Sequence, residues 1–154
     1  MEKQKVSWDT LHSDCVHIAS QIVRERREID VIVGLLRGGT VPATIISHLL
    51  KKPMIAVGLR SYTGTKQSDV MEVYQSAVED IQRLSSERKL NALMVDDLSD
   101  TGETLNYMLE TYSPLFSSVF TASPYIKVGT KHIPHYYSYT YAKEVWLDFP
   151  WETK

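Results

Sequence analysis

Three aspartates and a polar turn lie close together in residues 93–105, which read LMVDDLSDTGETL. Asp96 and Asp97 follow an apolar run at 90–95, and Thr101-Gly102-Glu103-Thr104 stands where a helical pattern opens. The first N–H groups of a helix have no partner within it and carry partial positive charge, so this turn can bind a phosphate. The paired carboxylates can accept hydrogen bonds from a ribose diol and can share Mg²⁺ with a polyanionic ligand. The order of these groups predicts a sugar-phosphate site.

A second candidate anion site follows another apolar run, at 31–36. It consists of Leu36, Arg37, Gly38 and Gly39. The arginine is a fork-shaped anion ligand, and glycines let backbone N–H groups approach a ligand closely. Taken alone, Arg-Gly-Gly is more often an ordinary turn.

Alternating strand and helix patterns must position these groups. Ser7 can cap a helix whose apolar face is Trp8, Leu11, Cys15, Ile18 and Ile22. Further helices are predicted at 40–50, with Pro42 in the first turn, and at 105–112, while 80–88 is left open as a short helix or a turn. Strands are predicted at 31–36, 54–59, 70–78, 90–95, 117–122, 136–141 and 145–149, and another ends at Tyr125-Ile126-Lys127. We expect an α/β fold: a mainly parallel twisted sheet with helices on both faces, plus a small C-terminal and hood region.

Composition narrows the function classes. The chain has 154 residues, 43% of them hydrophobic, with a net charge of −2 and no basic stripe for nucleic acid. Cys15 is the single cysteine, no apolar run reaches the ~18 residues of a membrane span, and the polar start MEKQKVSW does not resemble a signal peptide. We therefore expect one cytoplasmic domain over 1–154, without nucleic-acid or membrane partners. The five histidines have no metal-ligand spacing, so His132 and His135 are interpreted as surface or packing residues.

The stretch VDDLSDTGETL resembles the phosphoribosyl-pyrophosphate binding motif of type I phosphoribosyltransferases. The resemblance implies that Asp96 and Asp97 bind the ribose hydroxyls and that Asp97 meets Mg²⁺, partly through substrate and water. It also implies that the turn from Asp100 binds the 5′-phosphate, with Asp100 near the base as a candidate general base. The implied phosphoribosyl-binding residues are Asp96, Asp97, Leu98, Ser99, Asp100, Thr101, Gly102, Glu103 and Thr104.

Beside this motif, Leu36 to Gly39 resembles the pyrophosphate loop of the family, which often contains a cis peptide, here Leu36–Arg37. Arg37 would stabilise the charge on the leaving pyrophosphate. Arg60-Ser61-Tyr62 and the polar residues that follow resemble the flexible hood, about 60–70, that closes over the reacting centre. Lys66 could reach the pyrophosphate, although an ordinary surface lysine is the simpler interpretation.

The end of the chain, about 125–152, is similar to the xanthine-guanine and hypoxanthine branch, and the likeness covers nearly the whole sequence. It implies that Lys127 meets a purine 6-oxo group, that Trp146 packs on the ring, and that backbone near Leu147 reads its edge. Proline commonly follows the family lysine, but Val128 does here, and the segment 138–145 is longer than expected. Core packing for Trp146 and a solvated surface position for Lys127 remain alternatives.

The resemblance predicts a Mg²⁺-dependent purine phosphoribosyltransferase of purine salvage, with Asp100 and Arg37 as its catalytic residues. It uses phosphoribosyl pyrophosphate and a purine base, and the family usually forms homodimers or homotetramers. Two alternatives stay open: a non-catalytic regulator that senses phosphoribosyl pyrophosphate or nucleotides, and a transferase with a different acceptor.

Overall fold

A four-stranded parallel sheet stands at the centre of the computed structural model, which describes residues 1–59 and 70–152. Its strands run β3 (Met54–Val57), β2 (Val31–Leu35), β4 (Asn91–Val95) and β6 (Ser118–Ala122) in spatial order. All three neighbouring pairs are parallel. The short apolar runs therefore form the strands that were predicted for them, with bounds shifted by one or two residues. β2 and nearly all of β4 are buried as predicted, whereas β3 and β6 are partly exposed.

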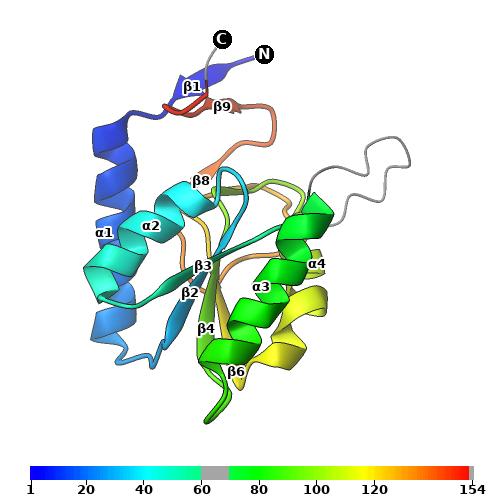
Figure 1. Ribbon diagram of the computed structural model, residues 1–154. Coiled ribbons are helices and arrows are strands. Elements are labelled where there is room, and N and C mark those ends of the chain that lie inside the picture. Colours follow the sequence, from blue (N-terminus) through cyan, green and yellow to red (C-terminus); the bar gives the residue numbers. More distant parts are fainter. Residues whose placement is uncertain (60–69, 153–154) are drawn as a thin grey trace.

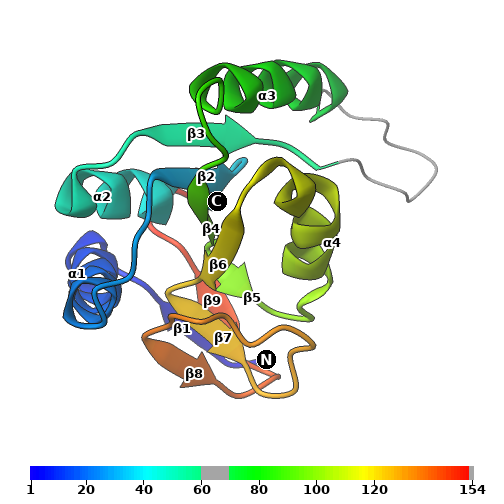
Figure 2. The ribbon, with the colours of Figure 1, turned by 90° about the horizontal axis from the view of Figure 1, so that it is seen from below.

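Helices cover both faces of this sheet (Figures 1 and 2). They are α1 (Trp8–Arg24), α2 (Thr40–Leu50), α3 (Val70–Leu84) and α4 (Glu103–Tyr112), the last followed by a 3₁₀ turn, η1 (Ser113–Leu115). Alternate strand residues enter two separate cores: Ile32 and Leu93 pack with α1 and α2, and Val33 and Met94 with α3 and α4. This arrangement confirms the predicted fold class.

Local signals set the first two helices. The Ser7 hydroxyl accepts a hydrogen bond from the Thr10 N–H at 3.1 Å, which is the predicted N-cap of α1. The apolar face of α1 is buried, apart from Trp8, which is 53% exposed. Pro42 lies in the first turn of α2, where a missing N–H costs no intrahelical bond.

The strand predicted at 70–78 is wrong, because these residues begin helix α3. Apolar residues at 70, 73, 74, 77, 78 and 81 recur every three or four positions, which is a helical period interrupted by polar residues. Ala77 and Ile81 are buried in the core that α3 and α4 form with the sheet. The segment left open at 80–88 is the end of this helix and a turn.

Two small parallel sheets extend the carboxyl edge of the main one. One runs β5 (Leu98–Ser99), β7 (Tyr125–Lys127), β8 (Tyr139–Tyr141), and the other pairs β1 (Lys3–Lys5) with β9 (Trp146–Asp148). The strand predicted at 136–141 is shorter, with Tyr136 forming an isolated bridge to Ala122. Figure 1 shows both termini beside the β1–β9 pair. Neither β1 nor β5 was predicted.

The structure does not describe the segment predicted to be the hood. Arg60, Ser61, Tyr62 and Lys66 lie outside the described residues, so the hood stays a prediction. Among the residues that are described, no helix combines the length and the apolar character that crossing a membrane requires.

The buried centre of the sheet gives a stability test. Leu93 is 0% exposed within the core that α1 and α2 share, whereas Leu49 on α2 is 39% exposed. We expect Leu93→Ala to lower the free energy of unfolding by about 2–5 kcal/mol and Leu49→Ala by under ~1 kcal/mol, measured by urea denaturation. Equal losses in the two variants would contradict this account of the core.

Candidate active site

The carboxylates at the end of β4 are withdrawn from water. Asp96 is 7% exposed and Asp97 is half-buried. The Asp96 N–H donates to the Ala122 carbonyl at 3.1 Å, and the Asp97 N–H donates to Asp96 Oδ1 at 2.9 Å. Burial, and then the neighbouring Asp97 charge, raise the pKa of Asp96 well above its ordinary value. Burial also raises the pKa of Asp97, so the pair holds a proton more readily than two exposed aspartates.

The turn after these acids leads into α4 as the sequence predicts. Asp100, Thr101 and Thr104 are exposed, and Gly102 has φ +84°, a left-handed backbone that favours glycine. The Glu103 N–H donates to the Thr101 hydroxyl at 3.3 Å, and the other N–H groups of the first turn of α4 lie near the exposed residues Thr101 and Thr104. Glu103 points its carboxylate to the Lys131 ammonium, 3.1 Å away in an exposed ion pair, which offsets its charge.

The Arg37-Gly38-Gly39 turn packs directly against the end of β4. The Leu36–Arg37 peptide bond is cis, as the resemblance implied. A side chain on Gly38 would collide with the Asp97 carboxylate, and a Cβ on Gly39 would lie 2.7 Å from the Leu35 oxygen and 2.8 Å from the Val95 oxygen. Only glycine allows these two turns to touch.

A pocket of ≈ 690 Å³ lies where the Arg37-Gly38 turn meets the end of β4. In the described part of the chain its walls are Arg37, Gly38, Val41, Asp97, Trp151 and Glu152. The Arg37-Gly38 turn and the Asp97 carboxyl group therefore line the same cavity. A carboxyl group and a guanidinium in one cavity suit a ligand that carries both hydroxyls and phosphates.

Trp151 and Glu152 were not predicted as site residues. The Trp151 ring stacks on Phe149 with centroids 4.6 Å apart and lies 6.0 Å from the Trp8 ring. The aromatic residues of Phe149-Pro150-Trp151 could have indicated Trp151 from the sequence. Trp146 was the only tryptophan of this region that was predicted as a site residue.

The residues predicted to bind the base do not line this pocket. Lys127 is buried, and its ammonium donates to the carbonyls of Val145 and Lys143. The solvated surface alternative for Lys127 is therefore wrong. Trp146 is 54% exposed on β9, and the Leu147 side chain is buried in the core. Any contact from Leu147 to a ligand must come from its backbone.

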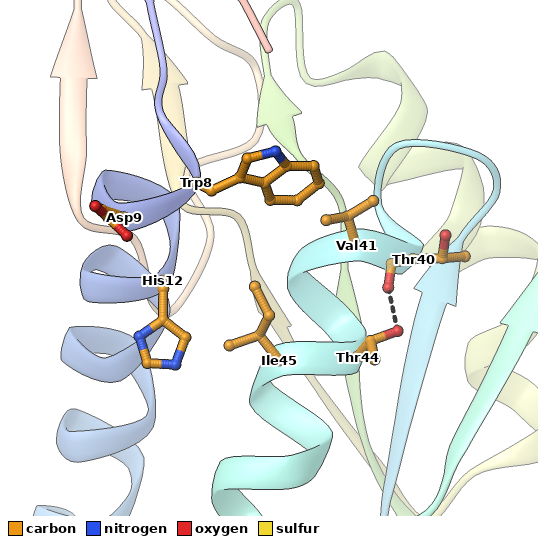
Figure 3. Close-up of a pocket in the computed structure, with 7 residues that line it drawn as sticks. All are labelled: Trp8, Asp9, His12, Thr40, Val41, Thr44 and Ile45. Carbon is orange, nitrogen blue, oxygen red and sulfur yellow. Dashed lines mark hydrogen bonds between the residues drawn. The ribbon is translucent and has the colours of Figure 1, made fainter. Parts of the chain in front are cut away.

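A second pocket, of ≈ 530 Å³, lies between α1 and α2 (Figure 3). Trp8, Val41 and Ile45 give it an apolar wall, and Thr44 is committed to the Thr40 carbonyl at 2.7 Å. Val41 lines both pockets. This apolar pocket is thus a direct neighbour of the cavity that holds Asp97.

Known proteins resemble this chain in sequence and in fold. Residues 7–144 match the phosphoribosyl transferase domain family. The chain is 29% identical to a xanthine-guanine phosphoribosyltransferase of Chromohalobacter salexigens, over 96% of this chain and 82% of that one. A purine phosphoribosyltransferase structure from Pyrococcus horikoshii aligns with a TM-score of 0.76 and 28% identity, covering 100% of this chain and 97% of that one. A Helicobacter pylori xanthine-guanine-hypoxanthine phosphoribosyltransferase, 19% identical with a TM-score of 0.71 over 98% and 94%, supports the fold.

The burial of Asp96 predicts a pH-dependent stability. Its pKa is raised in the folded chain, so the stabilisation from its protonated form is complete below the unfolded value of ~3.9 and is lost as pH rises toward the folded value. We expect Asp96→Asn, which stays neutral, to gain stability over the parent chain as the pH rises above the unfolded pKa of ~3.9. The free energy of unfolding, measured in EDTA at a series of pH values, tests it. A pH-independent difference would show that burial does not hold a proton at this carboxyl.

Proposed function

The chain belongs to the phosphoribosyl transferase family, and from this premise we propose that it transfers 5-phosphoribosyl from phosphoribosyl pyrophosphate to a 6-oxopurine. The products are a purine nucleotide and pyrophosphate, as in purine salvage. One observation carries the proposal: the Arg37-Gly38 turn and the Asp97 carboxylate line the same pocket at the strand ends. This pocket can receive a pyrophosphate and a ribose diol side by side.

The ribose phosphate is proposed to lie along the segment from Asp96 to Thr104. Thr101 to Thr104 supply backbone N–H groups and hydroxyls for the 5′-phosphate, and the exposure of both threonines supports this role. Asp96 and Asp97 accept from the ribose hydroxyls. Leu98 and Ser99 form β5, whose pairing with β7 holds the chain between the acids and the turn.

The acids suit Mg²⁺. Asp97 lines the pocket with a hard oxygen ligand, and among the described residues no group of three acidic, histidine or cysteine side chains is arranged as a metal cage. Such a site matches a magnesium ion that one carboxylate holds together with substrate phosphates and water. When bound, the ion would supply positive charge at the pyrophosphate.

The reaction exchanges one bond at the ribose anomeric carbon for another. The bond to the pyrophosphate oxygen breaks, and the pyrophosphate leaves with the electron pair while the ribose carbon gains oxocarbenium character. The Arg37 guanidinium and the N–H groups of Gly38 and Gly39 stabilise the negative charge that grows on the leaving group. A purine nitrogen forms the new bond and gives up its proton, for which exposed Asp100 is the proposed acceptor.

The segment 125–152 is proposed to bind the base. The Lys127 ammonium has three N–H donors; the carbonyls of Val145 and Lys143 account for two, which leaves one for a purine oxo group. The exposed Trp146 ring offers a stacking surface, and backbone near Leu147 offers hydrogen bonds to the 2-position edge. The names of the relatives support a purine acceptor.

We further propose that residues 1–154 act as one domain in the cytoplasm, as a homodimer or homotetramer. The exposed tyrosines Tyr137 and Tyr139 on and before β8 are compatible with contacts between copies. Light scattering of the purified chain measures the number of copies directly.

A turnover assay tests the proposal. Purified protein with phosphoribosyl pyrophosphate and Mg²⁺ is expected to release pyrophosphate with guanine, xanthine or hypoxanthine, and less with adenine or uracil. Asp97→Asn is expected to lower kcat/KM at least ~10-fold because it removes a charged ligand of the ribose and metal. Preference for adenine or uracil would favour the transferase with another acceptor. Absence of release with any base would favour the non-catalytic regulator.

Substitution of Lys127 tests the acceptor side. Lys127→Met keeps the length of the buried chain but removes every N–H donor, so kcat/KM for 6-oxopurines is expected to fall by about 10–100-fold. The KM for phosphoribosyl pyrophosphate should change little. A matched control is Lys143→Met, since this neighbouring lysine is exposed. Equal effects of the two substitutions on kcat/KM would contradict a role of Lys127 in binding the base.

A further inference from the structure

The segment after β7 turns back and packs against the proposed phosphate turn. The Lys131 N–H donates to the Thr101 carbonyl at 2.7 Å. The Ser99 hydroxyl donates to the His132 carbonyl at 2.7 Å and lies 3.0 Å from the Thr130 hydroxyl. A Cβ on Gly102 would collide with the His132 backbone nitrogen. Residues 130–132 therefore form a wall that touches the turn from Ser99 to Gly102.

The His132 side chain ties this wall to two other elements. Its Nδ1 lies 2.9 Å from Asn106 Oδ1 on α4, and its Nε2 lies 2.8 Å from the Thr121 hydroxyl on β6. The Thr121 N–H donates to His135 Nδ1 at 3.0 Å, so that nitrogen has already accepted a hydrogen bond with its single lone pair. The Thr121 hydroxyl lies 3.2 Å from the same nitrogen but only 2.8 Å from His132 Nε2, to which it donates. His132 Nδ1 then donates to Asn106. A neutral ring satisfies both bonds.

The surroundings favour that neutral ring. Burial, and then the nearby His135, lower the pKa of His132 below its ordinary value. The ring thus has one donor and one acceptor at neutral pH, which matches its two partners. Both partners lie on elements that flank the turn: α4 begins at Glu103, directly after it, and β6 pairs with β4, directly before the acids.

We propose that His132 is a positioning residue for the ribose-phosphate site, holding residues 130–132 against the turn so that its N–H groups keep the geometry that binds the 5′-phosphate. The inference rests on the proposed function, because it assigns that phosphate to this turn. His132 touches no reacting atom. It acts through Lys131 and Ser99, whose hydrogen bonds fix Thr101 and the wall.

A split in kinetic constants tests the role. His132→Ala removes the bonds to both Asn106 and Thr121, and Asn106→Ala removes only the bond to Asn106. Each is expected to raise the KM for phosphoribosyl pyrophosphate roughly tenfold while the KM for the base changes less than about twofold. The double variant should be no worse than His132→Ala alone, since that substitution already removes the shared bond. Ile133→Ala, at an adjacent residue that is 67% exposed, is the matched control.

Hydrogen exchange separates this inference from the proposed function. The Lys131 amide is expected to exchange at least ~10-fold faster in His132→Ala than in the parent chain, whether or not the protein turns over a purine. An active parent chain in which His132→Ala changes neither the sugar-phosphate KM nor this exchange rate would overturn the inference. An inactive parent chain with the expected exchange would overturn the proposed function and leave His132 as an anchor of the turn. Faster exchange in Ile133→Ala would also count against His132.

Discussion

The parallel pairing of β2 with β4 is the constraint on which the site depends. Gly34 is in register with Val95, so the chain leaves both strands at the same height on the same edge. The two turns that follow must then share one small space. Glycines at 38 and 39 meet that condition, because a Cβ at either position would enter the Asp97 carboxylate or the strand-end carbonyls. The pocket exists because backbone packs on backbone there.

This packing buries the Asp96 carboxyl group, and burial disfavours its charged form. Asp96 lies at the end of a strand whose residues Ala92 to Val95 are fully buried, and its carboxylate loses water without gaining a basic partner among the groups that shift its pKa. The hydrophobic cores on the two faces of the sheet offset the free-energy cost of burying this carboxyl group. We expect the folded chain to be less stable without a bound cation and diol than with them, since these ligands would supply hydrogen bonds and positive charge to the carboxyl groups.

The sequence predicted the features that depend on neighbouring residues. Ser7 and the apolar face of α1, the buried strands, and the strand–turn–helix around Asp96 are all contiguous, so local chemistry specifies them. The strand predicted at 70–78 is wrong because the segment is helical. Its polar residues at 72, 75 and 76 make an uneven strand pattern, although the apolar residues between them recur with a helical period. The roles of His132 and Trp151 depend on partners far along the chain, which no local period reports.

The same distinction separates the two halves of the site. The proposed sugar-phosphate side lies on one continuous segment, whereas the proposed base side is assembled from β7, the residues around Val145, and β9. β9 is held in turn by β1, through Trp146 N–H to the Glu2 carbonyl at 2.8 Å and Val6 N–H to the Asp148 carbonyl at 3.0 Å. The amino-terminal residues therefore support the proposed base side through backbone hydrogen bonds to β9. If the base binds there, substitutions far from the acidic motif can alter base selectivity while the motif and its proposed sugar-phosphate contacts stay unchanged.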